Sequence, residues 1–520
     1  MNLIFLTQSK TLALFYDVMR AIREKADLRN VGFYIADSAF FDTFKKEQSD
    51  VCSGSFELLK EWELIEKSDR IKPDIERLRK YEKMFGDPVL WNALIADRRI
   101  YLGRRATLEQ DYSSRFSHNR MLSILQTGIE EIESMFDRIQ PDLVVGFICV
   151  TLGEYLSYLV AKSRNIPFLN LRPTRIKNYF FAGESVLEPS AHLEETYHKL
   201  LVEGIPEPLK KKASSYLLEV RETHGMYEGV LPPPVSSRDR VSPKASMNGI
   251  SFIQKFESLV RRYYDYNFGE YKHDNHHRGV FYPIWFYKVK RPVRILVADL
   301  FLRRHYVRAN QLPSLDYAFY PLHKEPEVTL LVYGRPYLNQ IEVVRNLARS
   351  LPVGMKLVVK EHPAALGYRP LSYYRKLIAI PNVVLASPEI TSRQLIQDAS
   401  LVTIIGGSVG LEAVMLKRPV VMIGRAPFSF LPKTMICYCR NLDHLPWDIR
   451  ELLENQKHDE YALTAYVAAV IDNSVSADFY SRLLERKGVF REEAEGSLED
   501  DELERQKQIK MLANYLLDKV

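Results

Sequence analysis

Several features that would place this chain of 520 residues in a special class are missing from it. The four cysteines, Cys52, Cys149, Cys437 and Cys439, are too few for a disulfide framework, and the C-x-C pair lacks the second pair that a zinc site needs. No run approaches the ~20 apolar residues that cross a bilayer, and no unit of roughly 20–50 residues repeats. These absences argue against a disulfide-stapled secreted fold, a membrane-spanning chain and a repeat array.

A large surplus of one charge sign is also missing. The chain has 72 basic and 66 acidic residues, a net charge of +6, and its 46% of hydrophobic residues is ordinary for a folded protein. The length suits roughly two to four domains. The apolar run Leu3–Leu6 is too short for a signal peptide. We therefore expect a cytoplasmic protein with reduced thiols.

The basic charge is concentrated in one segment. Lys288–Arg308 carries seven lysines and arginines against Asp299, a local charge of +6 (seven minus one), and an aromatic cluster begins just before it at Trp285. Cations beside aromatic rings are typical of a contact with an anionic membrane surface, here the inner face of the cytoplasmic membrane through residues 285–308. A solvated basic face on an interdomain helix explains the same pattern. No recognised nucleic-acid-binding module accompanies the charge, so we expect no nucleic acid partner.

Apolar strands that alternate with amphipathic helices indicate a parallel α/β unit at the start of the chain. We expect its strands at 3–6, 31–36, 143–150 and 167–171, and its helices at about 11–25 and 151–164. The charged stretch 56–138 has a helical pattern and is predicted to be a helical insertion rather than sheet.

The same alternation returns in the second half of the chain. We expect strands at 317–322, 328–334, 356–360, 382–386, 401–406 and 419–424, with helices near 340–349, 371–380 and 393–399 and from about 410. Strands separated by single helices predict right-handed crossovers and a doubly wound sheet.

Less regular sequence separates the two units. Gly229–Lys244 holds three consecutive prolines among serine, arginine and aspartate, and is predicted to be a linker. The expected fold is α/β, with two Rossmann-like domains facing a cleft, helical insertions and a C-terminal helix. The predicted parts are an N-terminal domain at 1–190, a helical and linker region with the basic segment at 191–314, a C-terminal domain at 315–475 and a helical tail at 476–520.

The most informative motif is IIGGSVGLEA, where a predicted strand runs into a helix. Gly407 allows a positive φ, and Ser408 can cap the helix or donate to a phosphate. The helix N-terminus, as far as Gly410, is a ready anion site, and Glu412 in the first turn can accept two ribose hydroxyls. The motif predicts a nucleotide-binding loop, with a purely structural strand–helix turn as the alternative.

Two further strands of the second unit end in cationic residues. Lys360 and His362 belong to KEHP, where Pro363 fixes the loop, and Arg335 belongs to YGRP. Ligands bind at the carboxyl ends of strands in open α/β sheets. These side chains are therefore candidates to hold a diphosphate, while a surface arginine and a structural histidine are the alternatives.

Candidate catalytic groups come from both halves of the chain. His323 follows the first strand of the second unit and suits general acid or base work as well as a structural role. In the first unit, Asp37 ends a strand and Glu154 starts the helix after a core strand, where a helix-terminal charge is the alternative role. Arg172 and Arg175 form a cationic edge that can meet an acceptor phosphate or be solvated.

The order of these motifs resembles a known family. The segment Tyr317–Leu431 resembles the capsule polysaccharide biosynthesis proteins, which include Kdo transferases. It carries, in order, PLHKEPE, KEHP, a PNV strand, Thr391-Ser392, GGSVGLEA and KRPVVMIG. A weaker similarity lies at Asn170–Asn178 (NLRPTRIKN). The resemblance implies a GT-B-like fold, with an N-terminal acceptor domain and a C-terminal nucleotide-sugar donor domain. It also implies that His362 and Pro363 hold the donor nucleotide, and the wider GT-B pattern gives such contacts to Ser408 and Glu412.

The function that the resemblance implies is transfer of a sugar, with Kdo as one candidate, to a glycan or glycolipid acceptor. The donor would be a CMP- or UDP-linked sugar, without a further cofactor. Since no DxD-type motif ends a strand of the second unit, we expect a metal-independent enzyme. The first 300 residues match no catalytic motif of the family. A nucleotide-sugar 2-epimerase, a polyol-phosphate transferase and a non-catalytic assembly or export partner remain alternatives.

Overall fold

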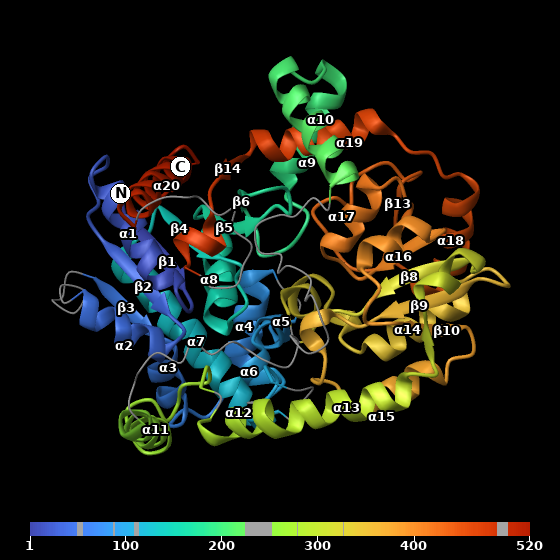
Figure 1. Cartoon of the computed structure of the whole chain (residues 1–520). Coiled ribbons are helices and arrows are strands. Elements are labelled where there is room, and N and C mark those ends of the chain that lie inside the picture. Colours follow the sequence, from blue (N-terminus) through green and yellow to red (C-terminus); the bar gives the residue numbers. More distant parts are fainter. Residues whose placement is uncertain are drawn as a thin grey trace.

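The computed structural model describes residues 1–48, 56–86, 89–103, 105–108, 114–223, 252–277, 279–325, 327–485 and 498–519. Two seven-stranded sheets lie side by side, each with helices on both faces (Figure 1). The predicted α/β class with two Rossmann-like halves in a GT-B-like arrangement is therefore confirmed. The predicted linker at 229–244 lies outside the described residues.

The first sheet is parallel over most of its width. Its strand order is β14 (Ser474–Ser476), β6 (Tyr179–Gly183), β5 (Phe168–Pro173), β4 (Leu143–Phe147), β1 (Leu3–Thr7), β2 (Val31–Ile35) and β3 (Glu57–Lys60). Only the pairs of β6 with β5 and with β14 are antiparallel. The chain moves from β1 towards β3 on one side and from β4 outward on the other, so the strand order reverses between β1 and β4. In open α/β sheets, ligands bind at the carboxyl ends of the strands at such a reversal.

Successive residues of β1 face opposite cores, as the two-residue period of a strand requires. Leu3 and Phe5 pack against α1 (Thr11–Arg23) and α20 (Leu498–Leu517), whereas Ile4 and Leu6 pack against α7 (His118–Ile139) and α8 (Leu152–Ser163). The insertion after β3 contributes α3 (Glu61–Ser68), α4 (Ile75–Phe85), α5 (Trp91–Ala96) and α6 (Arg98–Tyr101), and α2 (Ser38–Glu47) follows β2. The stretch expected to be a helical insertion holds these helices, and β3 at its start joins the sheet.

The second sheet is parallel throughout. Its strand order is β13 (Ile436–Tyr438), β12 (Val420–Met422), β11 (Leu401–Ile404), β8 (Tyr317–Pro321), β9 (Lys356–Lys360), β10 (Val383–Ala386) and β7 (Tyr306–Val307). Its helices are α14 (Gln340–Ser350), α15 (Leu371–Ile378), α16 (Ser392–Asp398), α17 (Ser408–Met415) and α18 (Leu445–Glu454). Here the order reverses between β8 and β11, and open α/β sheets bind ligands at the carboxyl ends of strands at such a reversal.

The strand predicted at 328–334 is wrong, because Thr329–Tyr333 forms a π-helical turn followed by a short helical turn at Arg335–Tyr337. Leu330 packs into the core of the second domain, while Leu331 and Val332 pack into the core of the first. The run is apolar because it fills the domain boundary on both sides. A short apolar run alone does not distinguish such a turn from a buried strand.

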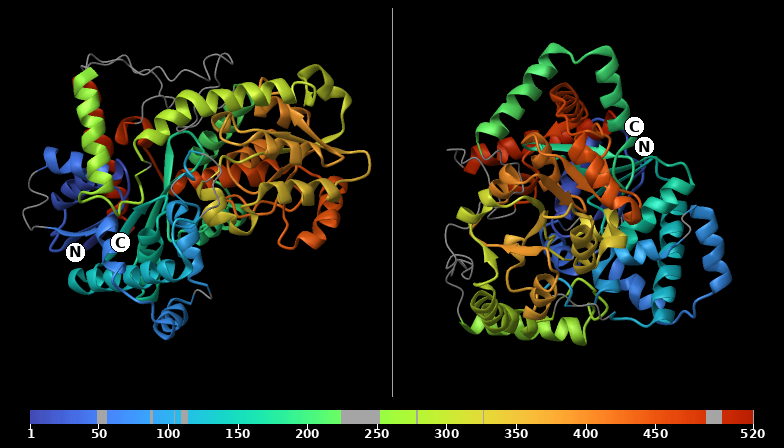
Figure 2. Two further views of the ribbon diagram at one scale, coloured as in Figure 1. Left: turned by 90° about the horizontal axis from the view of Figure 1, so that it is seen from below. Right: turned by 90° about the vertical axis from the view of Figure 1, so that its right-hand side faces the viewer.

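Several helices connect the two halves. α9 (Ala191–Glu203), α10 (Glu207–Glu222) and α19 (Glu460–Asp472) lie at the top of Figure 1, and α11 (Phe252–Asn267), α12 (Phe281–Trp285) and α13 (Arg291–Leu302) at the bottom. A π-helical turn at Phe286–Lys290 joins α12 to α13, and the resulting helix runs along one side of the molecule in both views of Figure 2. No described helix is both long and apolar enough to cross a membrane.

The chain returns to the first domain at its end. β14 pairs with β6 as an edge strand, and α20 packs beside α1 near the N-terminus (Figure 1). Arg505 on α20 forms an ion pair of 2.7 Å with Asp17 on α1. The sequence did not predict this second crossing, since a short strand and a charged helix show no preference for one sheet.

Candidate functional site

The crevice of the second sheet brings together residues that follow different strands. His323 follows β8, Glu361 and His362 follow β9, and Gly406 and Gly407 follow β11. These strands are neighbours, with β8 between β9 and β11. The residues predicted from strand ends therefore line one edge, and we call His323, Glu327, His362 and Gly407 the switch-point cluster.

The glycine loop has the conformation that its sequence predicts. Gly407 has φ +98, and a Cβ at Gly406 would lie 2.9 Å from the carbonyl oxygen of Arg425. Gly407, rather than Ser408, is the N-cap of α17, and no side chain caps this helix. The backbone N–H groups at its start thus remain available to an anion. Gly410 serves packing, because a Cβ there would meet Ile404 at 2.3 Å.

Glu412 is not in the first turn of α17, because the helix begins at Ser408 and makes Glu412 its fifth residue. Burial raises the pKa of Glu412 above its ordinary value, and the positive charge of Arg393 opposes this shift. The Arg393 guanidinium donates to the carbonyl oxygens of Val220 and Arg221 at the end of α10, at 2.8 Å each. Glu412 therefore lies near the contact between α17 and α10.

His323 and Glu327 form the polar centre of the switch-point cluster. Nδ1 of His323 lies 2.6 Å from Oε1 of Glu327, while the buried Nε2 has no hydrogen-bond partner among the described residues. A Cβ at Gly407 would be 3.5 Å from Cε1 of His323, so the imidazole lies against the glycine loop. Burial alone raises the pKa of Glu327, but the His323 hydrogen bond and the charges of His362 and Arg175 outweigh it and hold the pKa below its ordinary value. An ionised Glu327 makes Nδ1 the donor and turns Nε2 towards a ligand.

A buried frame holds His323 in place. Gln340 accepts from the backbone N–H of His323 at 2.7 Å and donates to its carbonyl oxygen at 3.1 Å. Arg369, which is almost fully buried, donates to the same carbonyl at 2.5 Å and pairs with Glu361. Tyr374 donates to the other oxygen of Glu361 at 2.7 Å. No sequence pattern indicated Gln340 or Arg369, since neither follows a strand and only the packing brings them to His323.

The two cationic residues of KEHP differ in their surroundings. Lys360 is buried, and its ammonium donates to the carbonyl oxygens of Pro388 and Ile390 in the loop after β10. His362 is exposed at the rim of the crevice, and its Nδ1 accepts from the N–H of Ala364 at 3.1 Å. Partial desolvation lowers the pKa of His362, although the nearby carboxylates oppose this. A neutral His362 keeps Nε2 for a ligand.

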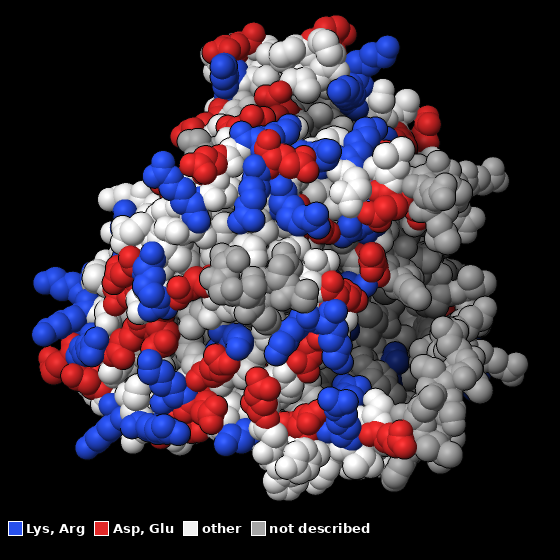
Figure 3. Space-filling view, turned by 90° about the vertical axis from the view of Figure 1, so that its left-hand side faces the viewer, with Lys and Arg blue, Asp and Glu red and all other residues white. Residues whose placement is uncertain are grey.

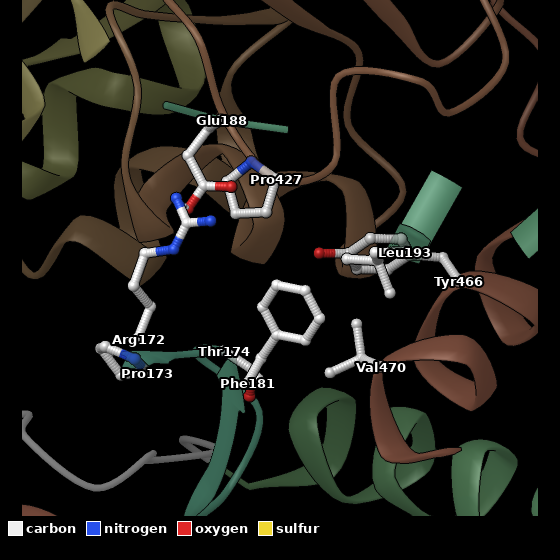
Figure 4. A pocket seen from close by; sticks show the side chains of 9 residues that line it. All are labelled: Arg172, Pro173, Thr174, Phe181, Glu188, Leu193, Pro427, Tyr466 and Val470. Atoms are coloured by element: carbon white, nitrogen blue, oxygen red, sulfur yellow. Dashed lines mark ion pairs between the residues drawn. The ribbon is translucent and has the colours of Figure 1, made fainter. Parts of the chain in front are cut away.

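The first domain meets this edge through its arginines. Burial by itself lowers the pKa of Arg172, but the Glu188 carboxylate, 2.7 Å away, raises it above the ordinary value (Figure 4). The pair lines a cavity of about 20 Å³, room for a single water, which Pro427 of the second domain helps to close. Arg172 is thus neutralised by Glu188, whereas Arg175 contributes positive charge to Glu327 across the domain boundary.

Arg335 and the first-domain carboxylates are held by other groups. The Arg335 guanidinium donates to the Tyr155 hydroxyl on α8 at 3.1 Å. Glu154 forms a capping box with Thr151 at the start of α8, and burial raises its pKa to about 7. Asp37 caps α2 by accepting from two backbone N–H groups. Neither carboxylate belongs to the switch-point cluster, because both follow strands of the first sheet.

Charges elsewhere on the surface are mixed. On the face shown in Figure 3, lysine and arginine side chains alternate with aspartate and glutamate. Ion pairs such as Arg138 with Glu57 are accessible to solvent and add little to stability. This mixing is consistent with the small net charge of +6.

The family comparison matches the second half of the chain. Residues 255–434 fit the family described as capsule polysaccharide biosynthesis protein, which confirms the resemblance seen in the sequence. This range includes every residue of the switch-point cluster and the helix formed by α12 and α13. No curated protein sequence matches the chain.

Solved structures with similar chains include two KpsC proteins of Thermosulfurimonas dismutans. The beta Kdo 2,4 transferase shares 11% identity, with 66% of this chain and 87% of that chain covered and a TM-score of 0.34. The beta Kdo 2,7 transferase shares 12%, with 71% and 97% covered and a TM-score of 0.35. The UDP-GlcNAc 2-epimerase of Neisseria meningitidis, bound to UDP-GlcNAc, shares 12%, with 91% and 98% covered and a TM-score of 0.29. TM-scores of this size carry no argument about function.

Proposed function

We propose that this protein is a metal-independent glycosyltransferase of capsule or surface polysaccharide synthesis. It would transfer a sugar such as Kdo from a CMP- or UDP-linked donor to a glycan or glycolipid acceptor. The observation that supports the proposal is that the matched family segment, residues 255–434, builds the crevice at the reversal between β8 and β11. Such crevices hold nucleotides in doubly wound folds.

The switch-point cluster suits the departure of a nucleotide phosphate. The free N–H groups of α17 and the positive end of its dipole favour an anion. In its doubly protonated form, His323 donates from Nδ1 to Glu327 and can also donate from Nε2 to the phosphate oxygen that gains charge as the glycosidic bond breaks. These groups act where charge develops in the oxocarbenium-like transition state, so the phosphate needs no metal ion at this edge.

The other predicted residues differ in whether they can contact a substrate. His362, at the rim, is placed to contact the nucleotide, and Arg175, beside Glu327, to contact a phosphate of donor or acceptor. Lys360 and Arg172 are buried and paired, which leaves them structural roles at the edge. Asp37 and Glu154 remain candidates for the acceptor half.

Attachment to an anionic membrane surface belongs to the same proposal. The helix of α12 and α13 exposes a row of large apolar side chains, Ile284, Trp285, Val289, Val293, Leu296 and Leu300, each 47–64% exposed. Arg291 and Arg294 donate to the carbonyl oxygens of Leu366 and Tyr368 and hold the helix on the second domain, while Arg303 and Arg304 are exposed. An exposed apolar row flanked by cations fits a lipid surface on the cytoplasmic side, where a glycolipid acceptor would be found.

Titration of the purified protein with nucleotides tests the donor site. We expect CMP or UDP to bind and His323→Asn to weaken transfer by about 10²-fold or more, as loss of an oxyanion donor does elsewhere. His192→Asn, at an exposed histidine on α9, is the matched control. Nucleotide release only with acceptor supports transfer, and interconversion without acceptor supports an epimerase. Absence of any nucleotide binding would support the non-catalytic alternative.

A further inference from the structure

The first domain contains a second polar centre, apart from the switch-point cluster. A cavity of about 860 Å³ lies at the carboxyl ends of β1 and β2, lined in part by Gln8, Asp37, Arg99, Arg262, Asp274 and His276. His276 connects its wall to two buried carboxylates, Glu61 and Asp97.

These three residues come from distant parts of the chain. Glu61 is the first residue of α3, Asp97 caps α6, and His276 lies beyond α11. One ligand atom of each residue lies within 4.8 Å of the other two, and Nε2 of His276 is 3.5 Å from Oε1 of Glu61. Ligand atoms around a tetrahedral zinc ion are about 3.3 Å apart, given bonds of about 2.0 Å. Small side-chain rotations would close the set onto one ion.

Two atoms of this set are buried without a hydrogen bond. Oε1 of Glu61 and Nε2 of His276 have no hydrogen-bond partner among the described residues, although their side chains are only 2% and 3% exposed. An unsatisfied buried polar atom costs about 1–3 kcal/mol. Both atoms belong to the set of three converging ligand atoms, so a common partner between them would satisfy both at once.

The other atoms of the ligands are held as they are in metal sites. Oε2 of Glu61 accepts from the Tyr34 hydroxyl, and the two oxygens of Asp97 accept from the N–H groups of Arg99 and Leu152 at 2.9 and 3.2 Å. Nδ1 of His276 faces the Asp37 carboxylate at 3.8 Å. Donors behind each carboxylate are usual supports of metal ligands, and the Asp37 carboxylate acts on His276 through its charge.

The electrostatics of the bare cluster are unfavourable. Burial raises the pKa of Glu61 to about 7, and burial together with Arg99 lowers the pKa of His276 to about 4. Burial is the largest cause of both shifts. A divalent cation would stabilise ionised carboxylates beside a neutral imidazole, which is the form that binds metal.

We propose that Glu61, Asp97 and His276 bind one divalent first-row transition cation, Mn²⁺ or Zn²⁺. A mixed set of two carboxylates and one imidazole suits these ions better than Mg²⁺ or Ca²⁺, which prefer oxygen ligands alone. The ion ties the starts of α3 and α6 and the segment after α11 into one unit beside the cavity. The site is in the first domain and is separate from the phosphate crevice, which needs no metal.

Metal binding to the full chain tests the proposal without any transfer assay. The protein is freed of metal with a chelator and titrated with MnCl₂ or ZnCl₂, followed by calorimetry and, for Mn²⁺, by its electron paramagnetic resonance signal. We expect one ion per chain and a higher melting temperature with metal. Glu61→Gln, which keeps an acceptor for Tyr34, and His276→Ala should each weaken binding at least tenfold.

Two controls separate this site from adventitious surface binding. Glu63→Gln, two residues from Glu61, and His273→Ala, three residues from His276, should bind metal as the unmodified protein does. Asp97→Asn, which still accepts from Arg99, serves if a ligand variant does not fold. The proposal is wrong if the chain binds neither ion, or if the ligand variants bind as tightly as the controls. Neither result changes the test of nucleotide binding.

Discussion

The guanidinium of Arg335 donates a hydrogen bond of 3.1 Å to the hydroxyl of Tyr155. Arg335 follows the turn at the domain boundary, and Tyr155 lies on α8, so this bond joins the second domain to the first. Arg335 was predicted from the sequence as a phosphate clamp. In the structure it has a protein partner, and the strength of that bond is measurable.

Removing either partner should loosen the domain boundary. We expect Tyr155→Phe to lower the free energy of unfolding by about 1 kcal/mol, the usual net value of a hydrogen bond. Arg335→Gln should cost a similar amount. In a double-mutant cycle followed by urea denaturation, the two changes should not add, because they remove the same bond. Fully additive losses would contradict the contact.

The glycine loop offers a test that separates strain from binding. Gly407→Ala places a Cβ on a residue with φ +98 and beside His323, while Gly354→Ala does so at φ +96 with no atom within 4 Å. Each change should cost about 1–2 kcal/mol of stability through the left-handed backbone. Only Gly407→Ala should also weaken CMP or UDP binding, measured by calorimetry. Equal nucleotide affinities in both variants would remove the loop from the binding site.

The contact between α10 and α19 should weaken in acid. Arg221 binds both carboxylate oxygens of Glu460, at 2.7 and 2.8 Å, and the arginine hydrogen bond is the main cause that lowers the pKa of Glu460 from 4.5 to about 2. A depressed pKa contributes stability above pH 4.5 and loses it as pH falls towards 2. Because Glu460 is half exposed, the contribution is at most about 1 kcal/mol.

Glu460→Gln checks this dependence. The variant should melt below the unmodified protein at pH 6, and the gap should narrow at pH 3.5. A gap that stays constant between the two pH values would show that Glu460 acts through packing rather than through its charge.

The exposed row on α13 predicts binding to anionic vesicles. Leu296→Gln with Leu300→Gln should reduce co-sedimentation with phosphatidylglycerol vesicles at least tenfold. Arg303→Gln with Arg304→Gln should lose about 1 kcal/mol per charge, and the loss should shrink at high salt. Val202→Gln, at an exposed residue of α9, is the control. Equal binding to neutral phosphatidylcholine vesicles would argue against the role of the cations.

Much of the fold followed from local patterns, because a strand buried on both faces reads as an apolar run. The wrongly predicted elements are those whose burial does not come from the centre of one sheet. The run around Leu331 is apolar because two domains meet there, and β3 reads as charged because it is an edge strand with half-buried residues. Neither a domain boundary nor a place at the edge of a sheet can be recognised from a short sequence window.

The residues of the candidate sites also divide into predictable and unpredictable ones. His323, His362 and Gly407 were predictable because each follows a strand, and parallel strands bring their ends to one edge. Arg369 and Gln340, which hold His323, had no such signal. Glu61, Asp97 and His276 are separated by long stretches of helix, so only the folded chain brings them together.

Because β14 and α20 return to the first domain, the two sheets are completed in a fixed order during synthesis. Every strand of the second sheet has been made once Tyr438 leaves the ribosome, whereas the first sheet still lacks its edge strand and the helix that covers α1. During synthesis the first domain therefore remains partly uncovered until β14 and α20 have been made. A nascent protein stalled before residue 474 would carry a finished second sheet and an unfinished first one.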